Sequence, residues 1–400
     1  MPSIAPVPIF SHRAPPTGYD RNWVANEFAA IQRTNPGIYQ ATGDGSGTRT
    51  AYEKMGEGPN VSPEDFVRDA GTGDTAKDNK AFTLALRELE SSGGILKLAA
   101  TTYLINDQQP PSGVSGAVIG AAGSGSIMKP DPANATRPTW DLQGRNGPAW
   151  VFARGKCDGA RPGHIETTAF LMGGVDGTNG IRFWDWWVSG CVYAKRFTAV
   201  CTDIRSIGCT TEQCSFNHYI ESDPTGIMAI GETNFVNACD LRVTGDCRTM
   251  LFSGYSYNCT TIAVLADTAT NFTLRDYAIQ GAAQGIQLTN ADGAALVGVS
   301  CGGCTTDIDA SGTNYLFSDG CAIDYSAVLA SGVLVGSRRG LKQRTWSVAA
   351  KPTMTNIPFY RGDRAELYQP TAGTVAEWVN AADSVLGVDA GDWRDCAAIS

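Results

Sequence analysis

Histidine is scarce in this chain: His12, His164 and His218 are the only three among 400 residues. None has neighbours that suggest a Ser-His-Asp triad, so a catalytic histidine is not expected. The sequence also has no nucleophile elbow, no phosphate-binding loop and no zinc-protease motif. If the chain is an enzyme, its catalytic groups are expected among its carboxylates.

Basic clusters and long apolar runs are absent as well. The 31 Lys and Arg residues are outnumbered by 40 Asp and Glu residues, which gives a formal net charge of −9. Without a basic stretch that could follow phosphate groups, nucleic acid is not an expected partner. No run approaches the roughly 18 apolar residues of a membrane span, so membrane insertion is not expected. The first ten residues, MPSIAPVPIF, lack the basic and apolar regions of a secretion signal.

Cysteine, in contrast, is frequent and periodic. Five of the twelve cysteines each precede a short apolar strand pattern, with successive gaps of 23, 25, 20 and 62 residues: Cys191, Cys214, Cys239, Cys259 and Cys321. A repeat of about 20–25 residues that contains strands predicts a solenoid. The periodic placement favours free thiols, packed as small apolar groups inside the solenoid, over disulfide bonds.

One further cysteine pair has the spacing of half a zinc site, namely Cys301 and Cys304. The sequence contains no second pair of this kind and very little histidine. Neither a metal ion nor another cofactor is therefore expected.

Residues 66–105 predict a strand, a turn, a helix and two further strands. Residues 66–68 (Phe-Val-Arg) form a short strand pattern, and residues 69–74 form a turn rich in Gly and Asp. Asp78 is a candidate N-cap of the helix. An apolar stripe at helical spacing follows, made of Phe82, Ala85, Leu86 and Leu89. Two glycines at 93–94 end the helix, and strands are expected at 95–98 and 103–105.

This order of elements resembles the start of the right-handed parallel β-helix of pectate-lyase-like proteins, especially phage tailspikes. The family pattern runs strand, Gly-Asp-Gly-x-x-Asp-Asp, capping helix, Gly-Gly, strand, Pro-x-Gly-x-Tyr, strand. The residues that match it are Gly73, Asp74, Asp78, Gly93, Gly94 and Tyr103. The chain departs from the pattern at Thr75, Asn79, Ala99 and Thr101. The turn match is therefore incomplete, whereas the order of the elements is kept.

The C-terminal region carries a second resemblance. Residues 358–363 and 390–393 are similar to a small β module found at the C-terminal end of phage spike proteins. Together the resemblances imply an all-β fold, a right-handed parallel β-helix with an N-terminal capping helix and a small C-terminal β module. The implied domains are residues 1–65 for virion attachment, 66–337 for the β-helix and 338–400 for the β-rich cap. A short amphipathic helix is also predicted around residues 22–32.

The resemblance implies a virion-associated tailspike or receptor-binding protein, assembled in the host cytoplasm as a homotrimer. Its N-terminal segment would dock on a phage tail or another virion protein, and its solenoid face would recognise bacterial surface polysaccharide. Whether the chain also cleaves that polysaccharide stays open. A free pectate-lyase-like hydrolase or lyase is one alternative, and a purely structural virion fibre is another.

Carboxylates in the repeats are the candidate catalytic residues. Glu221 and Asp246 each lie seven residues after a periodic cysteine, and successive coils stack about 4.8 Å apart. This offset predicts that the two carboxyl groups lie one above the other, about 5 Å apart, as in a retaining glycosidase. The alternative is that both are solvated turn residues. A second candidate set, on the other side of the repeat, consists of Asp185, Glu212 and Glu232.

The densest aromatic cluster is the segment Phe-Trp-Asp-Trp-Trp at residues 183–187. Strand alternation predicts that Trp184 and Trp186 share one face, and that Phe183, Asp185 and Trp187 share the other. Exposed tryptophans on a solenoid can stack on sugar rings, so Trp184, Trp186 and Trp187 are the candidate glycan-binding residues. Packing in the core or at a subunit interface is the alternative.

Overall fold

The computed structural model describes residues 59–398, apart from short segments at 122–124, 132–133, 135, 148, 160–166, 199, 222–224, 248–249, 340–342, 355–356, 358, 361–362, 368–374 and 385–389. The chain divides into two compact units, residues 1–54 and 55–400. The helix predicted around residues 22–32, and most of the predicted attachment segment 1–65, lie outside the described residues.

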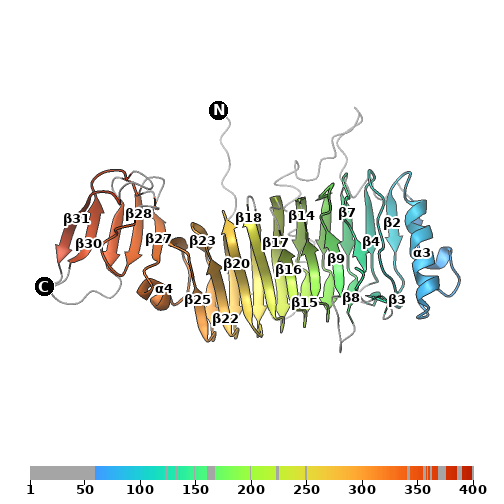
Figure 1. The fold of residues 1–400 in the computed structure, drawn as a ribbon. Helices are drawn as coiled ribbons and strands as arrows, with labels where there is room; N and C mark the ends of the chain where they lie inside the picture. The colour runs from blue at the N-terminus through green and yellow to red at the C-terminus, as the bar shows by residue number, and fades with distance from the viewer. Residues whose placement is uncertain are drawn as a thin grey trace. The chain divides into compact units, whose positions relative to one another are not determined.

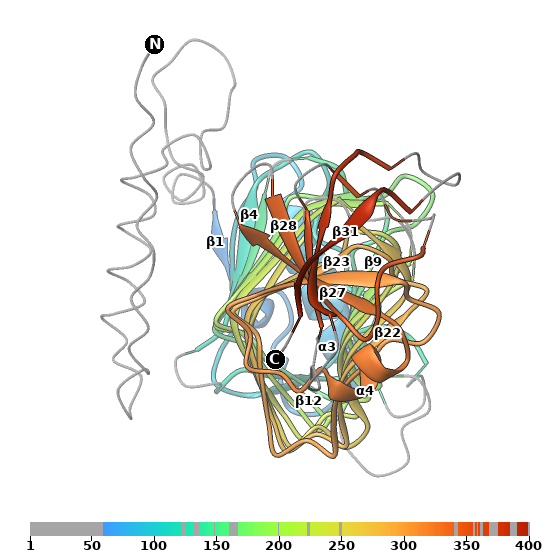
Figure 2. The same ribbon diagram turned by 90° about the vertical axis from the view of Figure 1, so that its left-hand side faces the viewer.

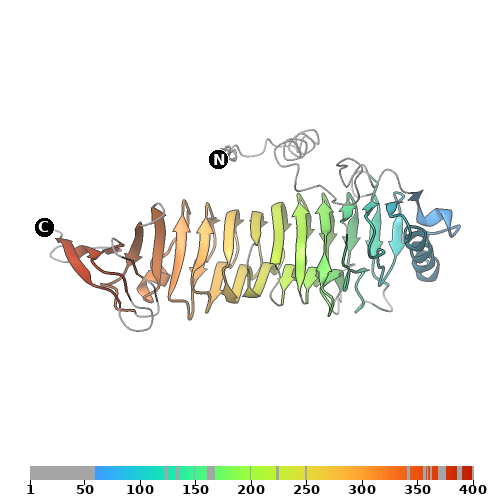
Figure 3. The same cartoon turned by 90° about the horizontal axis from the view of Figure 1, so that it is seen from above.

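The second unit is a right-handed parallel β-solenoid of about 11 turns, so the predicted fold class is confirmed. Figure 1 shows its strands following one another along the stack in chain order, and Figure 3 shows the same stack from above. The view along the stack shows successive coils superimposed around one interior (Figure 2).

Strands of the described residues form two sheets. The smaller sheet has eight parallel strands: β6 (Trp140–Asp141), β9 (Thr168–Met172), β13 (Tyr193–Phe197), β16 (Phe216–Ile220), β18 (Cys239–Asp246), β20 (Ile262–Thr270), β22 (Gln284–Thr289) and β25 (Thr306–Asp309).

The larger sheet has 23 strands, of which the first 18 belong to the solenoid coils: β1 (Asn60–Val61), β2 (Gly94–Lys97), β3 (Thr102–Leu104), β4 (Gly116–Ile119), β5 (Ile127–Lys129), β7 (Trp150–Ala153), β8 (Lys156–Asp158), β10 (Thr178–Asn179), β11 (Ile181–Trp184), β12 (Trp187–Ser189), β14 (Cys201–Ile207), β15 (Thr210–Glu212), β17 (Thr225–Phe235), β19 (Leu251–Tyr257), β21 (Thr273–Gln280), β23 (Ala294–Val297), β24 (Ser300–Gly302) and β26 (Tyr315–Asp319).

Residues at equivalent positions of successive coils lie directly over one another. Phe183 pairs with Ser206, which pairs with Ala229, and Phe252 pairs with Leu274. One coil therefore takes 22 or 23 residues. Inward-facing residues of this stack are buried and mostly apolar, and they form one continuous core. Stacking buries apolar area that no single coil could bury alone.

The helix α3 (Thr75–Glu88) covers the first coil, preceded by the short 3-10 helix η2 (Pro63–Asp65). Its N-cap is Asp74, whose carboxylate accepts hydrogen bonds from the backbone of Ala76 and Lys77. The prediction of Asp78 as the cap was wrong. Asp78 is fully buried and accepts from the backbone of Gly71 at 2.6 Å and of Leu104 at 2.8 Å, which ties the helix to the coil beneath it.

Two other details of this region are resolved by the structure. The apolar stripe of α3 is buried as predicted, and the Phe82 ring lies 5.1 Å from that of Tyr103. The strand predicted at 66–68 is wrong, because these residues form a turn after η2. The first strand is instead β1, which pairs with β2.

All twelve cysteines are free thiols, and eight of them are buried. Their stacking differs in part from the predicted ladder. Tyr193 pairs with Phe216, which places Cys191 beneath Cys214, but Phe216 pairs with Cys239. Cys239 therefore lies two residues beyond the Cys214 position, and the position over Cys214 is taken by Asn237.

After α4 (Ser326–Ala330) the stack ends in a small antiparallel module: β27 (Leu334–Arg339), β28 (Gln343–Val348), β29 (Arg364–Leu367), β30 (Val375–Asn380) and β31 (Trp393–Ala398). β27 pairs parallel with β26 and antiparallel with β28, so it is the junction. The module has its own core, which includes Trp346, Trp378 and Trp393. Asp363 is fully buried and accepts a hydrogen bond from Arg344 at 2.6 Å. None of the helices in the described part of the chain could cross a membrane.

Candidate functional site

The aromatic segment 183–187 does not follow simple strand alternation. Asp185 has a φ of 49°, which ends β11 and turns the chain before β12. As a result Phe183 and Trp186 both point inward and are only 1% exposed. Trp186 cannot stack on a sugar at the surface, and its prediction as a glycan-binding residue was wrong. Trp184 and Trp187 are half-buried on the outside, and Lys156 Nζ lies 4.3 Å from the centroid of the Trp187 ring.

The predicted catalytic pair does not form a direct vertical stack. Ile220 pairs with Val243, so the residue over Glu221 is Thr244, and Asp246 lies two residues farther along β18. At about 3.3 Å per residue this displaces Asp246 by roughly 6.6 Å along the strand. Arg196 donates to Glu221 at 2.9 Å, and Asn271 donates to Asp246 at 2.9 Å. The predicted spacing of about 5 Å was therefore wrong, because the two turns differ in length.

The second set of carboxylates is distributed over both sides of the wall. Asp185 lies exposed in its turn, and Glu212 is half-buried at the outer end of β15. Glu232, in contrast, points into the interior and is 3% exposed. Glu232 therefore cannot reach a ligand on the outer face, and its prediction as a catalytic alternative was wrong.

Glu232 is instead the centre of a polar network inside the solenoid. Its Oε1 accepts from Lys195 Nζ at 2.7 Å, and its Oε2 lies 2.6 Å from His218 Nε2. Asn217 donates to Oε2 at 2.9 Å, and Ser206 also donates to Oε1. These residues belong to three consecutive coils, so the network connects the two sheets and fastens neighbouring coils to one another.

The protonation states of this network follow from burial and charge. Burial alone would raise the pKa of Glu232, but His218 and Lys195 outweigh it and hold that pKa well below its ordinary value. Burial lowers the pKa of His218, and the Lys195 charge adds to this effect while Glu232 opposes it. His218 Nδ1 has no hydrogen-bond partner among the described groups. We therefore assign a neutral ring that donates from Nε2, with Glu232 and Lys195 charged.

The strongest candidate for ligand binding lies on the outer face of β13, β16 and β18. We call it the aromatic–arginine patch, defined by Tyr193, Phe216, Tyr219, Arg196 and Arg242. The Tyr193 and Phe216 rings are stacked, with centroids 5.5 Å apart and planes 12° apart. The Tyr219 ring lies within 4.9 Å of both. All five side chains are half-buried, so each keeps an accessible part.

The two arginines flank these rings. Arg196 lies 4.8 Å from the Tyr193 centroid, and Arg242 lies 5.0 Å from the Tyr219 centroid. Register places Arg196, Tyr219 and Arg242 one above another in three successive coils. Arg196 is paired with Glu221, whereas no described carboxylate pairs with Arg242. The patch thus offers apolar ring faces and an uncompensated guanidinium, a combination suited to an anionic ligand with apolar surface.

A groove of about 520 Å³ lies on the other sheet, over β19, β21 and β24. Tyr255, Tyr257 and Gln280 line it, and the Tyr255 and Tyr257 rings are stacked at 6.1 Å. No arginine or lysine is among its lining residues. This groove is the neutral counterpart of the aromatic–arginine patch.

The sequence held signals for features that pattern reading alone missed. Lys195 and His218 occupy the middle positions of two five-residue strands, 23 residues apart, which is one coil. Aligning the repeats at that spacing places two polar residues where later coils have Leu241 and Val264. The same alignment brings together Arg196, Tyr219 and Arg242.

No protein-family model and no curated protein matches the chain. Several solved structures are similar to it. ORF18 of Geobacillus virus E2 is 13% identical, with a TM-score of 0.49, over 85% of this chain and 77% of that one. An iota-carrageenase complexed to iota-carrageenan fragments is 13% identical, with a TM-score of 0.42, over 69% and 61%. The enzymatically active domain of tailspike protein 2 from bacteriophage CBA120 is 12% identical, with a TM-score of 0.41, over 69% and 45%. This likeness concerns the fold alone.

Proposed function

We propose that the chain is a tailspike-like receptor-binding protein that recognises an acidic bacterial surface polysaccharide through the aromatic–arginine patch. The observation that carries the proposal is the juxtaposition of three half-buried rings with Arg242, which has no described carboxylate partner. Sugar rings have an apolar face that packs on aromatic side chains. Guanidinium groups pair with carboxylate, sulfate or phosphate substituents through charge-assisted hydrogen bonds.

The net charge of −9 gives this recognition a selective character. An acidic glycan is repelled by most of the surface and attracted only where positive charge is exposed. The patch is a local exception to the acidic surface, so binding there should be specific in position and sensitive to salt.

The test compares single variants on an array of neutral and acidic glycans and then by calorimetry on the best ligand. Tyr219→Ala and Arg242→Gln should each weaken binding about tenfold or more, as for central anchors of an interface. Arg242→Gln should also flatten the salt dependence, whereas Tyr219→Ala should not. Tyr257→Ala in the neutral groove is the matched control and should bind as the wild type. Unchanged affinity in both patch variants, or loss only in Tyr257→Ala, would contradict the proposal.

Cleavage is a separate proposal that rests on Glu221, which lies beside the patch through its contact with Arg196. We keep Glu221 and Asp246 as the candidate catalytic residues, at a separation wider than a retaining pair requires. Glu221→Gln and Asp246→Asn should abolish the appearance of new reducing ends while glycan binding persists. Cleavage at the wild-type rate in both variants would remove them as catalytic residues. Asp185 and Glu212 would then be the next candidates.

Virion attachment and trimer formation are also proposals, supported by the family resemblance of residues 66–105 and of the C-terminal module. Light scattering should give three copies of the full chain at micromolar concentration, and a monomer would contradict the trimer. A chain that begins at residue 59 should stay trimeric and bind glycan but fail to join virions. Normal incorporation of that chain would contradict the assignment of the N-terminal segment.

A further inference from the structure

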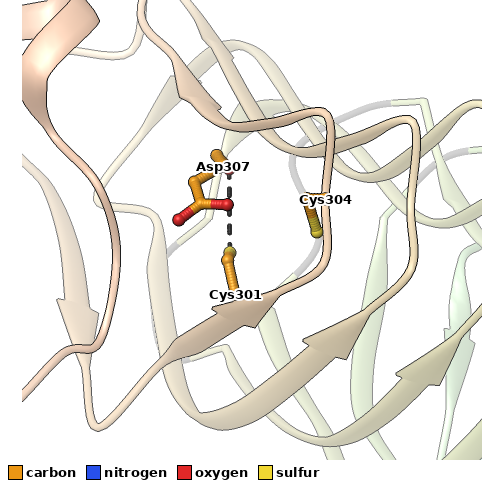
Figure 4. Close-up of side chains that lie close together, drawn as sticks. All are labelled: Cys301, Cys304 and Asp307. Atoms are coloured by element: carbon orange, nitrogen blue, oxygen red, sulfur yellow. Dashed lines mark hydrogen bonds between the residues drawn. The ribbon is translucent and has the colours of Figure 1, made fainter.

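We infer that Cys301, Cys304 and Asp307 form a binding site for a thiophilic divalent cation of the Zn²⁺ class. One ligand atom from each residue, two thiol sulfurs and a carboxylate oxygen, lies within 4.8 Å of the other two. Figure 4 shows the three side chains converging on the space enclosed by one turn of the chain. The site is independent of glycan recognition, since it uses none of the residues of the aromatic–arginine patch.

Local structure brings the three residues together. Cys301 lies on β24 and Asp307 on β25, and Cys304 lies in the turn that joins the two strands. Gly303 has a φ of 64°, which lets the turn bring Cys304 back toward Cys301. The turn is held from outside as well, because the backbone of Thr305 and of Thr306 donates to the preceding coil.

The coil beneath leaves room for the site. Gly285 on β22 lies under Asp307, and a Cβ atom there would come within 2.9 Å of the Cys301 sulfur. The absence of a side chain at this position keeps the thiol in place beside the carboxylate. The neighbouring coil contributes too, since the backbone of Asp324 donates to Asp307 Oδ2 at 2.9 Å. That bond orients the carboxylate, as outer partners of metal ligands commonly do.

The donor set selects the kind of cation. Two sulfurs and one oxygen suit Zn²⁺ and Cd²⁺ and are poor ligands for Mg²⁺ or Ca²⁺, which take oxygen ligands only. Zn–S bonds of about 2.3 Å place tetrahedral sulfurs about 3.7 Å apart, so the ligand atoms need to close by only about 1 Å. Water would fill the fourth position. Binding replaces the two thiol protons, which are released to the solvent.

The sequence spacing showed only two of these ligands, which argued against a metal. The third ligand is a carboxylate that lies three residues after Cys304. A disulfide between Cys301 and Cys304 is the competing use of the same two sulfurs, and the test separates the two.

The experiment titrates Cd²⁺ into the full-length chain, after reduction, chelation and removal of both reagents. We expect one equivalent to bind with a thiolate-to-cadmium charge-transfer band, and one equivalent of Zn²⁺ to displace it. Cys301→Ser and Cys304→Ser should lose the band, and Asp307→Asn should keep a weaker one with affinity lowered about tenfold or more. Cys396→Ser, which alters an exposed thiol of the C-terminal module, should behave as the wild type.

Two further measurements keep the outcome decisive. Zn²⁺ should raise the melting temperature of the wild type and of Cys396→Ser but not of Cys304→Ser, with circular dichroism confirming that each variant is folded. An unchanged band in Cys301→Ser and Cys304→Ser, or no bound equivalent in the reduced wild type, would overturn the inference. So would mass spectrometry showing that Cys301 and Cys304 are joined by a disulfide in protein isolated from cells.

Discussion

Replacing Glu232 by Gln should destabilise the solenoid more than any surface change of the same kind. The variant leaves the Lys195 ammonium, which is 1% exposed, without the carboxylate that accepts from it at 2.7 Å. Removing one partner of a buried ion pair costs about 3–5 kcal/mol. With an unfolding entropy of roughly 2.1 cal/mol/K per residue over about 340 residues, this lowers the melting temperature by about 4–7 °C.

Thermal unfolding followed by circular dichroism measures this shift, and Glu221→Gln is the matched control. The Glu221–Arg196 pair is about 30% exposed on both sides, and such pairs contribute about 0–1 kcal/mol. Its loss should move the melting temperature by roughly 1.5 °C or less. The double variant Lys195→Met/Glu232→Gln should melt above Glu232→Gln, because it leaves no unpaired charge. A Glu232→Gln protein that melts within about 1 °C of the wild type would refute the assignment of a charged pair in the core.

Three other predictions concern the interior and its cap. Burial lowers the pKa of His218, so this residue costs stability as the pH falls below 6.5, whereas burial raises the pKa of Asp240 to about 6, so its contribution is lost as the pH rises through that value. Between pH 7 and pH 5, Asp240→Asn should therefore lose stability in melting experiments and His218→Leu should gain it; parallel pH profiles would contradict both assignments. Asp78→Ala should cost roughly 3 kcal/mol or more in chemical denaturation, since it removes two hydrogen bonds to a carboxylate, against about 1 kcal/mol for Asp74→Ala, and equal costs would show that Asp78 does not fasten the cap. Thiol titration should find at most four reactive groups in the native chain and twelve after denaturation, because eight thiols are buried; reaction of all twelve at once would show an open core.

The architecture was predictable because it depends on repetition, which a single sequence displays. The spacing of the cysteines gave the coil length, and the Asp-rich turn with its apolar helix identified the cap. Register was not predictable at the level of single residues. Turn residues in the left-handed conformation, such as Asp185 and Gln213, shift every following residue by one or two positions.

Those shifts decided which candidate residues face solvent. Trp186 lies inside because the chain turns at Asp185, and Asp246 misses Glu221 because of the difference in turn length. Glu232 resembles a surface carboxylate in the sequence, and only the opposite wall of the solenoid explains its burial. The partners that neutralise it, Lys195 and His218, lie on the other sheet, 37 and 14 residues away.

The internal polar network also bears on how the chain finds its own alignment. Coils of nearly equal length with apolar interiors can in principle stack with one coil looped out, since hydrophobic burial alone distinguishes such arrangements poorly. The residues that pair with Glu232 lie only in the two coils before it, and the equivalent positions farther along are Leu241 and Val264. A stack that skipped the coil of His218 would leave the ammonium and the carboxylate one layer out of place, each among apolar side chains. The network therefore works as an address within a repetitive molecule, penalising misthreaded chains more than it stabilises the correct one.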